Sequence, residues 1–98
     1  MSFSFHPEAE IEFNQAIDYY EDCRNGLGYE FSIEVLYAIE RAVSYPKTWF
    51  LIQGKIRRSL VNRFPYAILY TELKNEVYIL AVMNLHKKPG YWKKRKYT

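Results

Sequence analysis

The chain has 98 residues, enough for one hydrophobic core, so we expect a single domain spanning residues 1–98. Hydrophobic residues make up 49% of the sequence and charged residues 26%, a composition that excludes a disordered chain. There is no stretch of ~20 apolar residues that would cross a bilayer and no secretory leader pattern after Met1, and the single cysteine, Cys23, cannot form an internal disulfide. We therefore expect a cytoplasmic protein that binds no membrane.

Charge divides the chain into two halves. Residues 1–48 contain 3 Lys/Arg and 9 Asp/Glu, a net charge of −6, whereas residues 49–98 contain 11 Lys/Arg and 2 Asp/Glu, a net charge of +9. This asymmetry predicts one cationic face that meets a polyanion or an acidic protein. The alternative is that these charges only keep the protein soluble.

Two helices are predicted in the first half. Phe3–Phe5 alternates as a short edge strand, and His6 precedes a proline that suits the first position of a helix. Apolar residues then recur every three or four positions, which predicts a helix over Pro7–Asp22 followed by a glycine-containing link. A second apolar stripe predicts a helix over Leu27–Ala42, which Ser44-Tyr45-Pro46 ends. The short link implies an antiparallel helical hairpin.

After Trp49 the apolar period changes to two. Three hairpin-connected strands are predicted over Lys55–Asn62, Tyr66–Leu73 and Glu76–Asn84. The order strand, helix, helix, meander predicts an α+β fold, in which an antiparallel sheet has both helices on one face and leaves the other face available to the basic residues of the second half. The basic and aromatic stretch from Pro89 onward predicts a helical turn or a flexible tail.

Generic catalytic motifs are missing from the sequence. It contains no phosphate-binding glycine loop, no HExxH and no CxxC, and His6, His86 and Cys23 lack the spacing of metal ligands. We therefore expect neither a metal nor a cofactor.

A different set of motifs spans nearly the whole chain. In order, they are Phe5-His-Pro-Glu-Ala-Glu10, Gly54-Lys-Ile-Arg-Arg58, Arg63-Phe-Pro-Tyr-Ala-Ile-Leu-Tyr70, Ile79-Leu-Ala-Val82 and His86-Lys-Lys-Pro-Gly-Tyr-Trp92. Their order and spacing resemble the RelE/ParE superfamily, the toxins of bacterial type II toxin–antitoxin (plasmid stabilisation) systems.

This resemblance implies a toxin that a co-encoded antitoxin neutralises by wrapping an extended or helical segment around it. RelE-like relatives cleave messenger RNA in the ribosomal A site without a metal, whereas ParE-like relatives poison DNA gyrase. We rank ribosome-dependent messenger RNA cleavage first by a narrow margin. The alternative is gyrase inhibition without enzymatic activity, and a further alternative is a non-toxic RNA-binding module.

A metal-free ribonuclease needs a base for the ribose hydroxyl, cations for the developing phosphorane charge and an acid for the leaving oxygen. In RelE-like relatives, strand Lys and Arg residues and a late Arg and Tyr fill these roles. The resemblance carries them to four candidate catalytic residues, Arg58, Arg63, His86 and Tyr91. Candidate nucleic-acid contacts are Lys55, Arg57, Lys87, Lys88, Lys93, Lys94 and Arg95, with Lys96 continuing the basic tail.

Two departures weaken the catalytic interpretation. First, Phe64-Pro65-Tyr66 is typical of the ParE branch. Second, lysines follow His86 where arginines are usual in the family, and lysine cannot make the bidentate contact with phosphate that arginine makes. Arg57 and Arg58 are neighbours on a strand, so only one can line the open face. Each of the other candidates also has a structural interpretation. Arg63 could solvate the hairpin, His86 could make a structural hydrogen bond, Tyr91 could be a packing residue, and the tail lysines could be a solvated tail.

Overall fold

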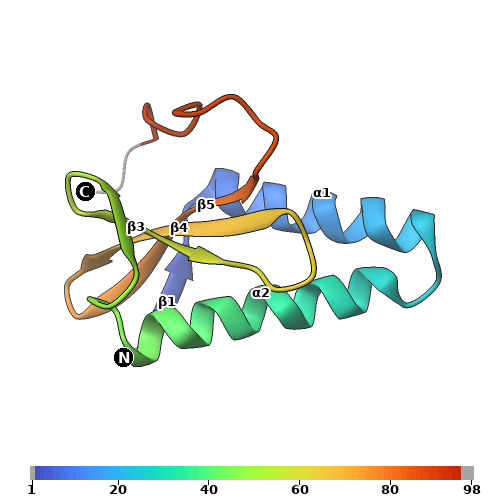
Figure 1. Ribbon diagram of the computed structural model, residues 1–98, viewed down its shortest axis with the longest axis horizontal. Helices are drawn as coiled ribbons and strands as arrows, with labels where there is room; N and C mark the ends of the chain where they lie inside the picture. Colours follow the sequence, from blue (N-terminus) through green and yellow to red (C-terminus); the bar gives the residue numbers. More distant parts are fainter. Residues whose placement is uncertain (1, 96–98) are drawn as a thin grey trace.

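Two helices that form a hairpin cover one face of a five-stranded sheet in the computed structural model, which describes residues 2–95 (Figure 1). The elements in chain order are β1 (Ser2–Phe5), α1 (Pro7–Cys23), α2 (Leu27–Ser44), β2 (Phe50–Gln53), β3 (Ile56–Leu60), β4 (Tyr66–Leu73) and β5 (Glu76–Asn84). Both predicted helices and all three strands of the predicted meander are confirmed. Neither helix in the described part is long and apolar enough to cross a membrane.

Local side-chain chemistry specifies the start of α1 and the link between α1 and α2. His6 is the N-cap of α1: its Nδ1 accepts the Glu8 backbone N–H at 3.0 Å, and Pro7 occupies the first helical position. At the other end of α1, the Glu21 carboxylate accepts the backbone N–H groups of Gly26, at 2.9 Å, and Gly28, at 3.1 Å. Gly26 has a φ of 88°, which a glycine adopts without strain. The link is therefore specified by short-range contacts.

The sheet order is β1-β5-β4-β3-β2, and it contains one parallel pair, β1 with β5. The expectation of an entirely antiparallel sheet was therefore wrong. The parallel pair arises from β2, a four-residue strand that was not predicted from the sequence. This strand adds one chain reversal between the helices and β5. With that reversal, β5 runs in the same direction as β1.

A β-bulge interrupts the central β4–β5 pair. Leu69 pairs with Ala81, but Tyr70 pairs with Ile79, so Leu80 is an extra residue on β5. Leu80 and Ala81 both belong to an apolar cluster on the face away from the helices, while Ile79 faces α1 and α2. The bulge therefore provides apolar surface on the helix-free face.

The C-terminal segment, Pro89–Arg95, uses that apolar surface. Trp92 is only 5% exposed and joins the cluster formed by Ile56, Leu69, Leu80 and Ala81. The expectation that the helix-free face is open was therefore wrong for this part of the sheet, because burying a tryptophan side chain is strongly favourable. The sequence left a helical turn or a flexible tail open for this segment. The structure shows consecutive turns through Lys94 and no regular helix among the described residues after β5, and Lys96 lies outside the described residues.

Candidate functional site

Arg57 and Arg58 point to opposite faces of β3. The Arg57 guanidinium donates a hydrogen bond to the Trp49 carbonyl at 2.9 Å on the helix side, where Trp49 packs against the main core. The Arg58 guanidinium lies over the Phe50 ring, 5.2 Å from its centroid. Of the two arginines, Arg58 is therefore the one on the helix-free face.

Arg63 pairs with helix α2. It sits in the β3–β4 turn with a φ of 73°, and its guanidinium contacts Glu30 at 2.7 Å and Glu34 at 3.8 Å. The hydrogen bond from Arg63 lowers the pKa of Glu30 and raises that of Arg63. The Arg63 charge is thus balanced by acids on the helical layer, which covers the face opposite to Arg58.

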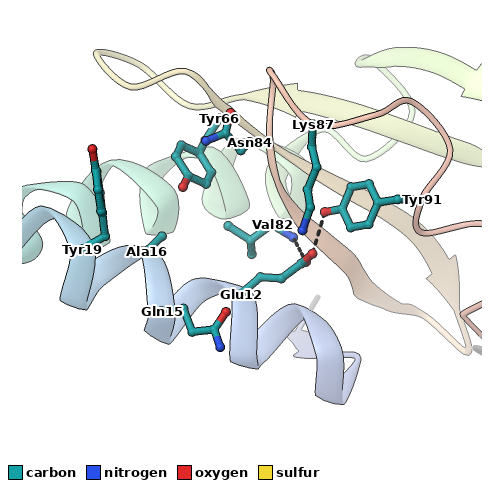
Figure 2. Close-up of a pocket in the computed structure, with 9 residues that line it drawn as sticks. All are labelled: Glu12, Gln15, Ala16, Tyr19, Tyr66, Val82, Asn84, Lys87 and Tyr91. Carbon is teal, nitrogen blue, oxygen red and sulfur yellow. Dashed lines mark hydrogen bonds between the residues drawn. The ribbon is translucent and has the colours of Figure 1, made fainter.

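Tyr91 and Arg95 meet at Glu12, a residue of α1 (Figure 2). The Tyr91 hydroxyl donates to Glu12 Oε2 at 2.6 Å, and the two terminal nitrogens of Arg95 each donate to one carboxylate oxygen at 2.8 Å. Glu12 Oε1 also accepts the Val82 backbone N–H at 3.0 Å, and Arg95 donates to the Leu80 carbonyl at 3.1 Å. Burial and the hydrogen bond to the Glu12 carboxylate raise the pKa of Tyr91, so the phenol keeps its proton and donates it to Glu12.

This Glu12 cluster, formed by Glu12, Tyr91 and Arg95, covers the part of the β5 edge that has no neighbouring strand. The pairing of β1 with β5 ends at Ile79, so β5 continues beyond its neighbour. Backbone groups of Leu80 and Val82 then find partners in side chains instead of a strand. No local sequence pattern indicates this role of Glu12, because its partner Arg95 is 83 positions away.

A small cavity of about 160 Å³ lies beside this cluster, between α1 and β5 (Figure 2). Tyr19, Tyr66 and Asn84 form its wall, and the Lys87 ammonium reaches in from above, 4.7 Å from the centroid of the Tyr91 ring. His86 is exposed and borders a neighbouring, more open hollow together with Lys87. The structure thus brings Tyr91 and Lys87 together and leaves His86 at the rim.

The remaining candidate cations occupy separate places. Lys55 lies in the β2–β3 turn beside Arg57, while Lys88, Lys93 and Lys94 are exposed on the C-terminal segment. Within residues 2–95, none of these four lysines forms an ion pair. In the same residues there is no cluster of His, Cys, Asp and Glu that could hold a metal ion.

General acid–base cleavage of RNA requires an acid, a base and a cation around one phosphate. Here Arg58 lies on the helix-free face, Arg63 is bound to α2, and the Tyr91 hydroxyl is directed to Glu12. The four candidate catalytic residues therefore do not form one constellation.

The architecture matches a known toxin–antitoxin structure. A chain of a solved structure described as "Chromosomal ParDE TA system from P. aeruginosa" superimposes with a TM-score of 0.62 at 16% sequence identity, over 88% of this chain and 97% of that chain. The chain shares the fold of this ParDE protein. The expected RelE/ParE-like α+β fold is confirmed by this likeness, which extends over nearly the full length of both chains. No protein-family model and no curated protein sequence matches the chain.

Proposed function

We propose that the chain is the toxin of a type II toxin–antitoxin system and that it acts by binding its target, in the manner of a ParE-like inhibitor of DNA gyrase. The observation that carries the proposal is the likeness in fold to a protein of the P. aeruginosa ParDE system over 97% of that protein. The Phe64-Pro65-Tyr66 turn, typical of the ParE branch, agrees with it.

The arrangement of the candidate catalytic residues supports binding over cleavage, which reverses the order favoured on sequence alone. Arg63 and Arg95 are engaged by Glu30 and Glu12. Tyr91 has a raised pKa and donates to the same Glu12, so it has a structural task. Ribosome-dependent messenger RNA cleavage remains the second candidate, because Arg58 and Lys87 keep cations on the surface.

The toxin proposal is tested by induction in a bacterial host. The protein alone is expected to arrest growth, and co-expression with the protein encoded by the adjacent gene is expected to restore it. One purified preparation is then divided between a gyrase supercoiling assay without ribosomes and a primer-extension assay of ribosome-bound messenger RNA. Normal growth at confirmed expression of folded protein would contradict the toxin assignment.

Two variants separate the mechanisms. For a gyrase inhibitor, Arg63→Ala and Tyr91→Phe should keep inhibitory potency within a few-fold, since both side chains are bound to glutamates of the helical layer. For a ribonuclease, each should lower the cleavage rate by about 10²–10³, the typical cost of removing one stabilising donor. Cleaved messenger together with unimpaired supercoiling would reject the gyrase mechanism in favour of the second candidate.

A further inference from the structure

A second cavity lies at the end of the sheet where β2 turns into β3, and it shares no lining residue with the cavity beside the Glu12 cluster. Its volume is about 380 Å³. The α2–β2 loop, the β2–β3 hairpin and β4 meet around it. We call it the β2–β3 cavity, and its lining residues are Lys47, Leu51, Gly54, Lys55, Arg57, Thr71 and Glu72.

Hydrogen bonds from β4 fix the backbone of the two other segments at this cavity. The Tyr70 hydroxyl donates to the Pro46 carbonyl at 2.8 Å, directly before Lys47 in the α2–β2 loop. The Thr71 hydroxyl donates to the Lys55 carbonyl at 3.2 Å in the β2–β3 turn. Because the segments that carry the cations are already held in place, a ligand would order only the lysine side chains on binding.

The cavity carries an excess of positive charge. Its lining contains three cations and one acid, Glu72, which leaves a net charge of +2. The Glu72 carboxylate lies 3.9 Å from the Lys47 ammonium, whereas within residues 2–95 neither Lys55 nor Arg57 forms an ion pair. Arg57 donates to the Trp49 carbonyl through one terminal nitrogen, and a guanidinium has five N–H donors in all. Donors and charge therefore remain available to an anion.

We propose that the β2–β3 cavity binds the phosphate group of a small phosphate monoester. Such a group carries a charge of about −1.5 to −2 at neutral pH and has three terminal oxygens, which matches a net charge of +2 and three cations. The free donors of the Arg57 guanidinium and the two lysine ammonium groups contact these oxygens in charge-assisted hydrogen bonds. The argument uses no part of the toxin function, so this site stands or falls independently of it.

The charge and the lining favour a monoester over a phosphodiester strand. Each phosphate of a nucleic-acid backbone carries only one negative charge, and the strand gains affinity from contacts with many cations along its length. Beside its three cations, the cavity is lined by Leu51, which is 49% exposed, and by the Glu72 carboxylate. An apolar side chain and an acid tolerate a small ligand next to the phosphate but do not extend a cationic track.

Titration of the full-length protein with methyl phosphate tests the site. Amide resonances are followed by NMR at an ionic strength held constant with sodium chloride. The signals of Gly54 and Lys55 are expected to shift and to reach saturation. Dimethyl phosphate and acetate, which each carry a single negative charge, should bind more weakly than methyl phosphate.

Three variants show whether the cavity itself binds the anion. Lys55→Gln should weaken methyl phosphate binding by about fivefold or more, because it removes a charge-assisted hydrogen bond. Glu72→Gln should strengthen binding by about twofold or more, because it removes the acid from the lining. Lys88→Gln is the matched control: it removes the same charge from an exposed lysine of the C-terminal segment and should leave the dissociation constant unchanged.

Each other outcome contradicts the site or its ligand. Signals of Gly54 and Lys55 that do not shift, or equal weakening by Lys55→Gln and Lys88→Gln, would overturn the cavity as a binding site. Amide signals elsewhere in the variants should match those of the wild type, which shows that the fold is intact. Binding of duplex DNA that Lys55→Gln abolishes, without binding of methyl phosphate, would replace the monoester by a nucleic-acid backbone.

Discussion

Glu12 shows how one side chain connects three parts of the molecule. It lies on α1, accepts a backbone N–H of β5, and holds Tyr91 and Arg95 of the C-terminal segment. The Glu12 and Arg95 side chains are only 15% and 11% exposed, so each depends on the other for its charge balance. Such a pair is costly to break from one side, because the remaining ion is left in a poorly solvated place.

We therefore predict that Glu12→Gln lowers the free energy of unfolding by about 2–3 kcal/mol, slightly less than for a fully buried pair. Urea unfolding followed by circular dichroism measures the change. Glu10→Gln, an exposed neighbour in the first turn of α1, is the control and should cost well under about 1 kcal/mol. In a double-mutant cycle with Arg95→Gln, the two losses should be clearly less than additive. Additive losses would show that the pair does not act as a unit.

The C-terminal segment behaves as an additional layer of the fold. Its backbone hydrogen bonds are internal turns, from Lys93 to Gly90 and from Arg95 to Trp92. It is held on the sheet by side chains, with Trp92 on the helix-free face and Arg95 at the β5 edge. The position of this segment on the sheet therefore depends mainly on the contacts of Trp92 and Arg95.

Trp92→Ala is accordingly expected to destabilise the protein by about 3–5 kcal/mol, the usual cost of removing a buried tryptophan side chain. Thermal or urea unfolding gives the value. Tyr29→Ala removes an aromatic ring that is 70% exposed on α2 and should change stability by no more than about 0.5 kcal/mol. Equal effects of the two substitutions would mean that the segment is not packed on the sheet in solution.

The charge asymmetry of the sequence becomes an asymmetry of layers in the whole molecule. All nine acids of the first half lie on α1 or α2, whereas most cations of the second half lie on the sheet, its turns and the C-terminal segment. Arg63, which pairs with Glu30 and Glu34, and Arg95, which pairs with Glu12, join the layers. The cations that remain unpaired are those available to a partner.

Stability of the whole molecule should fall at alkaline pH. Tyr70 on β4 donates to the Pro46 carbonyl at 2.8 Å, and burial raises its pKa from 10.0 to about 12. Because the unfolded chain loses this proton near pH 10.0 while the folded chain keeps it, the stabilisation is complete below pH 10.0 and declines as pH rises toward 12. Unfolding free energies on both sides of pH 10.0 measure the decline.

Tyr70→Phe removes the hydrogen bond to Pro46 and should lower the free energy of unfolding by about 1 kcal/mol at neutral pH. The free energy of unfolding of this variant should also decline less at alkaline pH than that of the wild type. The raised pKa of Tyr91 leaves part of the decline in place. An identical pH dependence in variant and wild type would exclude Tyr70 as its source.

The amino-acid sequence by itself determined the elements that depend on short-range chemistry. The His6-Pro7 helix start, the apolar stripes of both helices and the alternation along β4 and β5 all act over a few residues. The opposite orientation of Arg57 and Arg58 likewise follows from strand geometry. The motif order was also sufficient to predict the RelE/ParE-like fold that the comparison confirmed.

Only the tertiary structure decided the features that depend on distant partners. Strand β2 is short, largely exposed and apolar without alternation, so its pairing with β3 defines it. The parallel β1–β5 pair follows from β2, and the covering of the helix-free face follows from Trp92 meeting the β5 bulge. The functional difference between Arg58 and Arg95 arises in the same way. Both are arginines in basic stretches, but an acid 83 positions from Arg95 neutralises it, whereas Arg58 has no such partner among residues 2–95.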